Sequence, residues 1–147
     1  RLILCDALAL ACEEQPDLLL DFATLTGAAR VALGPEVPAL FTPDDQLAAD
    51  LARWSREVSD PLWRLPLWEP YNEMISSPVA DINNAGEGGF AGAITAALFL
   101  QRFVSPSTSW AHFDLYAWTN ASRPGRPKGG EAMILRALWA LLASRYA

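Results

Sequence analysis

A short β-prone run, residues 18–23, ends abruptly at Thr24-Leu25-Thr26-Gly27 and is followed by an alanine-rich segment. A helical pattern at residues 2–14 precedes this run and stops before Pro16. Helices and strands continue to alternate along the chain. Parallel strands need such helical crossovers, which cover both faces of the sheet. We therefore predict an α/β fold, a three-layer αβα sandwich around a mainly parallel sheet.

The remaining elements follow from periodicity and from turn residues. Thr42-Pro43-Asp44-Asp45 is typical of a helix start, with a capping hydroxyl followed by acids that face the helix dipole. Strands are expected at residues 39–42 and 110–118, a short helix at 71–76, and longer helices at 93–104 and 131–145.

Composition limits the class of protein. A chain of 147 residues with 52% hydrophobic content can bury one sizeable core. It contains no apolar run long enough to span a bilayer, so we expect no membrane contact. A net charge of -6 argues against nucleic acid as a partner. Cys5 and Cys12 are expected to be reduced thiols, which fits a cytosolic protein.

Several polar patterns have both a functional and a structural interpretation. His112 and Asp114 alternate on one strand face, as a ligand pair or as a base with its orienting group would; a structural hydrogen-bonded pair is favoured. The glycine-rich residues 81–92 lack the features of a phosphate loop, so close packing is favoured there. The aromatic residues between positions 60 and 78 fit either packing under a loop or a subunit contact.

Arg1 directly precedes a helix that has no Ser, Thr, Asp or Asn as a cap. A guanidinium beside free helical N–H groups suits a carboxylate, phosphate or bicarbonate ion. Truncation of a longer chain explains the missing cap equally well.

Six motifs occur in order along the chain: RLILCDALALA, DFATLTGAARVALG, LWRLPLW, ADINNAG, AGAITAALFLQRFV and WAHFDL. Together they resemble the C-terminal part of the catalytic domain of the leucine aminopeptidase family, the two-metal cytosolic peptidases. The resemblance implies a zinc-peptidase-like fold and a hydrolase that removes leucine-like residues from the N-terminus of peptides. It also implies a homo-hexamer in the cytoplasm.

The resemblance further implies roles for five residues. Arg1 matches the arginine that holds the bicarbonate acting as general base, and Leu25 and Gly27 match residues that bind the substrate backbone. Thr24 matches a wall of the pocket for the N-terminal side chain. Tyr116 falls where the family has a small pocket residue, so we expect its phenol to narrow or polarise the pocket. Where the family loop usually has an arginine, this chain has Glu87 or its neighbours, which puts the role of that loop in doubt.

The resemblance places every ligand of the two divalent ions, zinc or manganese, upstream of Arg1. We therefore expect this chain to be a partial catalytic domain, with the ligand segment and an N-terminal domain in the upstream part of the same polypeptide. Two alternatives remain open: a non-catalytic relative acting as a scaffold or DNA-binding protein, and a stand-alone module that binds peptide termini.

Overall fold

The computed structural model describes residues 1–86 and 88–147. Its elements, in chain order, are α1 (Leu2–Glu13), β1 (Leu18–Ala23), α2 (Ala28–Leu33), β2 (Ala39–Phe41), α3 (Asp45–Glu57), β3 (Trp63–Arg64), the 3-10 helix η1 (Glu69–Ile75), α4 (Gly92–Gln101), β4 (Ser109–Asp114), β5 (Trp118–Thr119), β6 (Gly129–Gly130) and α5 (Leu135–Tyr146).

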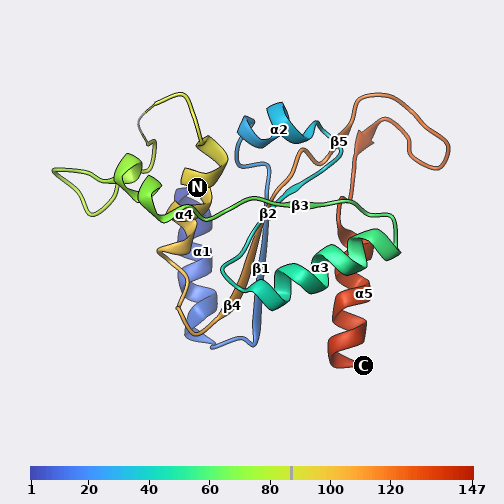
Figure 1. Ribbon diagram of the computed structural model, residues 1–147, viewed down its shortest axis with the longest axis horizontal. Coiled ribbons are helices and arrows are strands. Elements are labelled where there is room, and N and C mark those ends of the chain that lie inside the picture. Colours follow the sequence, from blue (N-terminus) through green and yellow to red (C-terminus); the bar gives the residue numbers. More distant parts are fainter. Residues whose placement is uncertain (87) are drawn as a thin grey trace.

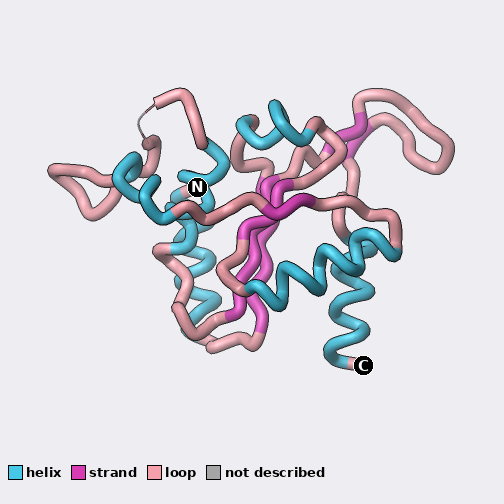
Figure 2. Tube along the Cα trace, in the orientation of Figure 1, coloured by secondary structure: helices cyan, strands magenta, loops and turns pink. Residues whose placement is uncertain are grey.

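The central sheet has four strands in the order β1-β4-β2-β3. β1 pairs with β4 in parallel and β2 pairs with β3 in parallel, whereas β2 and β4 are antiparallel. Helices α1 and α4 lie on one side of the sheet, and α3 and α5 lie on the other (Figure 1, Figure 2). The expected three-layer arrangement around a mainly parallel sheet is confirmed.

Each face of the sheet packs against its own hydrophobic core. Phe113 of β4 belongs to the core that includes α3 and α5, and Trp110 belongs to the core that includes α1 and α4. Five of the six β4 residues are buried, because β4 has a strand on each side and a helical layer on each face. Apolar side chains at both odd and even positions of β4 are therefore required.

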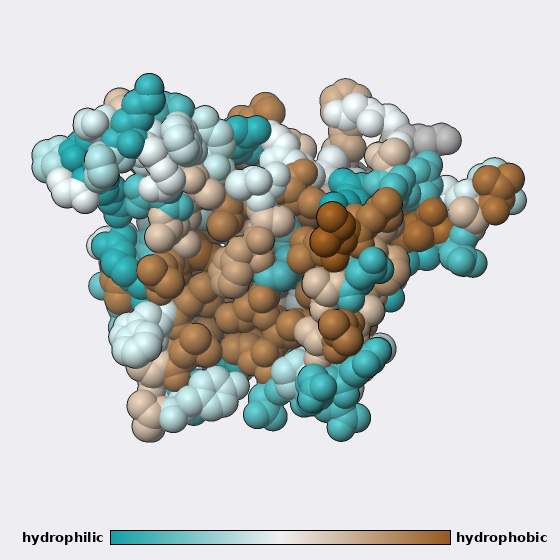
Figure 3. Space-filling view, turned by 180° about the vertical axis from the view of Figure 1, so that it is seen from behind, coloured by the Kyte–Doolittle hydropathy of each residue, from teal (hydrophilic) through white to brown (hydrophobic). Residues whose placement is uncertain are grey.

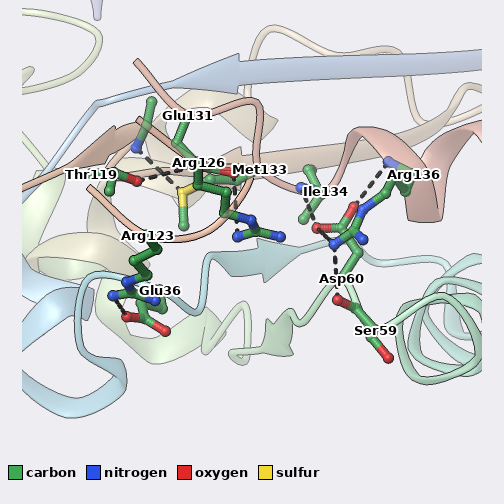
Figure 4. Close-up of polar contacts among 11 residues, drawn as sticks. Glu36, Ser59, Asp60, Thr119, Arg123, Arg126, Glu131, Met133, Ile134 and Arg136 are labelled. Carbon is green, nitrogen blue, oxygen red and sulfur yellow. Dashed lines mark hydrogen bonds and ion pairs between the residues drawn. The ribbon is translucent and has the colours of Figure 1, made fainter. Parts of the chain in front are cut away.

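Two elements are shorter than their sequence patterns predict. The strand expected at 110–118 ends at Asp114, and Ala117 adopts a left-handed conformation with φ 53°. The last helix begins at Leu135 rather than 131. The carboxylate of Asp60 accepts hydrogen bonds from the backbone N–H groups of Ile134, Arg136 and Ala137 (Figure 4). A distant loop thus supplies the N-terminal cap, which a local pattern could not reveal.

The start of α3 differs from the expected one by two residues. Asp44 is the cap and accepts from the N–H of Leu47 at 2.9 Å. The Thr42 hydroxyl instead donates to the carbonyl of Trp110 on β4 and accepts from the Asp44 N–H. Hydrogen bonds from Leu47 and Ser109 lower the pKa of the Asp44 carboxyl.

In the part of the chain that the structure describes, no helix combines the length and the apolar character that crossing a membrane requires. Cys5 is buried and Cys12 is half-buried, and both thiols are free.

Candidate active site

The turn at residues 24–27 lies at the carboxyl end of β1 and leads into α2. Thr24 and Gly27 are exposed, while Leu25 and Thr26 are half-buried. β1 and β4 run in parallel, with Ala23 opposite Asp114, so both strands end at the same edge of the sheet. Ligands of open α/β sheets collect at such carboxyl ends. The turn is therefore open to a ligand.

Asp114 holds this turn in place from the end of β4. One of its carboxylate oxygens accepts from the backbone N–H groups of Leu25, at 3.2 Å, and Thr26, at 3.1 Å. The other oxygen accepts from the Thr26 hydroxyl. The carboxylate is 5% exposed, so these bonds form largely out of water, where they are strong. Asp114 thereby fixes the conformation of the turn at residues 24–27.

The clamp leaves two backbone groups of the turn available. The N–H of Leu25 is occupied by Asp114, but neither the Leu25 carbonyl nor the Gly27 N–H has a hydrogen-bond partner within residues 1–86 and 88–147. Exposed backbone acceptors and donors of this kind can pair with an extended peptide as a further strand would. The expected roles of Leu25 and Gly27 thus correspond to unpaired groups in the structure.

Arg1 lies in the same neighbourhood. Its guanidinium donates to the carbonyl of Asn84 and lies 5.6 Å from the centre of the Phe99 ring. Burial lowers the pKa of Arg1, and the nearby charge of Asp114 partly raises it. Arg1 is also the N-terminal boundary residue of α1, which has no side-chain cap. The anion site that the sequence predicts at Arg1 would use the charge and the planar donors of this guanidinium.

Tyr116 reaches the turn through Arg30, the third residue of α2. The Arg30 guanidinium carbon lies 4.7 Å from the centre of the Tyr116 ring. On its other side, Nη2 of Arg30 lies 2.9 Å from where a β-carbon on Gly27 would be. The Tyr116 hydroxyl donates to Asn120 at 3.3 Å. The Arg30 guanidinium thus lies close to both Tyr116 and the turn.

Sequence reasoning missed two residues of this cluster. It assigned Asp114 to a pair with His112, because the strand was expected to continue to residue 118 and therefore not to end at Asp114. Arg30 carried no signal, because a single basic residue in an alanine-rich helix is ordinarily solvated. Glu87, expected in the loop where the family usually has an arginine, lies outside the residues that the structure describes.

The favoured pairing of His112 with Asp114 is wrong. His112 Nδ1 lies 2.5 Å from an Asp21 oxygen, and Asp21 also accepts from the indole N–H of Trp110 at 2.8 Å. Asp21 is directly opposite His112 in the β1–β4 register. Directly opposed residues of neighbouring strands approach to about 5 Å, closer than alternate residues of one strand. This triad is buried, which favours a structural role.

The metal centre that the resemblance implies would take its ligands from upstream of Arg1, outside this chain. No group of three or more His, Cys, Asp or Glu side chains lies together in residues 1–86 and 88–147. We therefore assign no metal ligand to this chain and derive no reaction step through a metal.

A hollow lies between the β5–β6 hairpin and the loops that carry Glu36 and Asp60, and it shares no residue with the turn. Arg123 is paired with Glu36, and Arg126 is 3.3 Å from Glu131 (Figure 4). Asp60 is occupied in capping α5. With these charges already paired, the hollow offers less for recognition than the turn does.

Comparison with protein families gives a match to the model of the cytosol aminopeptidase family, catalytic domain, over residues 1–139. A probable cytosol aminopeptidase from Chlorobium limicola is 43% identical over 143 residues, which are 97% of this chain and 28% of that protein. The chain thus spans less than a third of the length of this relative.

Two solved structures are also similar to this chain, one of them a cytosol aminopeptidase. The crystal structure of cytosol aminopeptidase from Coxiella burnetii superposes with a TM-score of 0.94 at 56% identity, over 99% of this chain and 32% of that one. The bottromycin maturation enzyme BotP, in complex with Mn, superposes with a TM-score of 0.87 at 38% identity, over 97% of this chain and 32% of that one.

Proposed function

We propose, since the chain belongs to the cytosol aminopeptidase family, that it is part of a metallo-aminopeptidase that removes leucine-like residues from the N-terminus of peptides. One observation carries this proposal. The exposed turn at residues 24–27 presents an unpaired carbonyl and an unpaired N–H beside Arg1, on a carboxylate clamp.

The proposed roles follow from the chemistry of each group. The Leu25 carbonyl and the Gly27 N–H bind the substrate main chain. Thr24 and Tyr116 line the pocket for the N-terminal side chain. Arg1 holds an anion such as bicarbonate, which supplies a proton acceptor near the scissile bond. The ligands of the two divalent ions, zinc or manganese, are proposed to lie elsewhere in the polypeptide; one structural neighbour was solved with Mn.

The exposed edge of β1 supports the proposal that this chain is a partial domain. In the described part of the chain β1 has one neighbour, β4, and its sequence LLLDFA carries none of the lysines or prolines that usually protect an edge strand. Hydrophobic side chains gather over this face of the molecule (Figure 3), and Phe22 is 46% exposed. We propose that further strands of the same polypeptide cover this edge and bring the metal ligands.

We also propose that the complete enzyme assembles as a homo-hexamer in the cytosol. Trp63, Trp68, Trp118 and Trp139 are each 46% exposed or more, which supports burial in further contacts. The names of the relatives and the free thiols support the location.

The proposal predicts that the 147-residue chain alone, purified and supplied with zinc or manganese, hydrolyses no leucine anilide, because residues 1–86 and 88–147 contain no metal-ligand set. The complete polypeptide under the same conditions is expected to release the anilide. Robust turnover by the 147-residue chain would contradict the proposed division of the domain. Binding of peptides without turnover by the complete polypeptide would instead support a peptide-terminus binding module.

Tyr116 is expected to set the size of the specificity pocket. In the complete enzyme, Tyr116→Ala opens space beside the turn and should raise kcat/KM for large N-terminal residues relative to alanine. The expected change is about tenfold, since each methylene discriminates by about 1–3 kcal/mol. Rates on a series of aminoacyl anilides measure it. An unchanged order of preference would show that Tyr116 does not line the pocket.

A further inference from the structure

Arg30 places a positive charge beside the turn at residues 24–27. Its guanidinium carbon lies 4.7 Å from the centre of the Tyr116 ring, and its Nη2 lies 2.9 Å from the position that a β-carbon of Gly27 would take. Gly27 has no side chain to hold the guanidinium away, so the charge lies directly against the backbone that we propose binds the substrate. The chain therefore carries a positive charge at a position where binding a leucine-like substrate side chain would require no charge.

The guanidinium has no anionic partner in the described part of the chain. The arginines at positions 53, 64, 123, 126, 136 and 145 form ion pairs with carboxylates there, whereas Arg30 forms none. The nearest acid of the cluster, Asp114, is occupied with the N–H groups of Leu25 and Thr26. The planar face of Arg30 rests on Tyr116, which leaves its N–H edge free to bind a carboxylate.

We propose that Arg30 is a specificity-determining residue, so that the enzyme, besides leucine-like residues, accepts an N-terminal aspartate or glutamate in preference to the corresponding amide. In this arrangement the substrate carboxylate accepts hydrogen bonds from the guanidinium, and the apolar part of its side chain lies against Tyr116. A lysine or arginine at the same position is disfavoured by repulsion from Arg30. This inference rests on the proposed aminopeptidase function and names the substrate class of the same site.

The ratio of kcat/KM for an N-terminal glutamate to that for glutamine tests the charge alone, because the two side chains have nearly the same shape. We expect the complete polypeptide to favour glutamyl over glutaminyl anilide by about tenfold, as a charge-assisted hydrogen bond permits. Arg30→Met keeps the length of the side chain and should bring the ratio to about one. Arg30→Lys keeps the charge and should retain part of the preference.

Arg53→Met is the matched control. Arg53 on α3 also rests on an aromatic ring, 4.4 Å from the centre of Trp54, but it is not part of the site. This variant should leave the ratio unchanged. Hydrolysis of both anilides with a ratio that Arg30→Met does not alter would overturn the inference and leave the aminopeptidase function standing. Failure of the unaltered polypeptide to hydrolyse any aminoacyl anilide would overturn both.

Discussion

Replacing Arg1 with methionine in the complete polypeptide is expected to lower kcat for leucine anilide by at least about 100-fold, the lower end of what general acid–base catalysis contributes. The reason is that methionine carries no charge with which to hold an anion, so the proposed proton acceptor is lost. Steady-state kinetics measure the effect. Arg1→Lys keeps the charge but not the planar fork of donors, and should retain intermediate activity.

Arg102→Met serves as the control for Arg1. Arg102 caps the C-terminal end of α4 and donates to Asn72, and it is exposed and outside the site. Its replacement should leave kcat unchanged. If Arg1→Met changed kcat no more than Arg102→Met does, the assignment of Arg1 to the anion site would be wrong.

Replacing Asp114 with alanine should lower both the stability of the protein and the activity of the complete enzyme. The substitution leaves two backbone N–H groups and the Thr26 hydroxyl without their acceptor. A loss of about 3 kcal/mol in the free energy of unfolding is expected, since each unsatisfied buried group costs about 1–3 kcal/mol and water replaces part of the bonding. A turn that is no longer held should lower kcat/KM by at least about tenfold.

Asp60→Ala separates these two effects. Asp60 is as deeply buried as Asp114 and accepts three backbone N–H bonds, but it caps α5 rather than the turn (Figure 4). The Asp60→Ala variant should lose a similar free energy of unfolding, measured by urea denaturation. Its kcat/KM should stay unchanged under conditions in which the variant remains folded. Equal losses of kcat/KM in the two variants would mean that Asp114 acts through global stability and not through the turn.

The sequence predicts the layers of this fold well because each layer leaves a periodic pattern. β1 was expected at residues 18–23, as observed, because a six-residue β-prone run, apolar except for Asp21, is bounded by Asp17 and by the turn. The end of β4 and the start of α5 were misjudged, because both depend on contacts between distant segments. The cap that Asp60 provides for Ile134 spans 74 residues of sequence.

Apart from Arg1, which its residue type had marked as an anion position, the candidate site was predictable only through the resemblance. Thr24, Leu25 and Gly27 are ordinary turn residues, and their unpaired backbone groups become visible only when Asp114 is seen to occupy the N–H groups of Leu25 and Thr26. Arg30 could not be found from local sequence, because its role depends on contacts of its side chain with Gly27 and with the distant Tyr116. Side-chain pairing across strand ends is a tertiary property that no short pattern encodes.

A crystal structure of the complete polypeptide with a non-hydrolysable dipeptide analogue tests the docking role of the turn most directly. We expect the analogue's main chain to hydrogen-bond to the Leu25 carbonyl and the Gly27 N–H at about 2.7–3.2 Å, with Asp114 still bound to Leu25 and Thr26. An analogue bound at another edge of the sheet, with the turn at residues 24–27 free of contact, would contradict the proposed site.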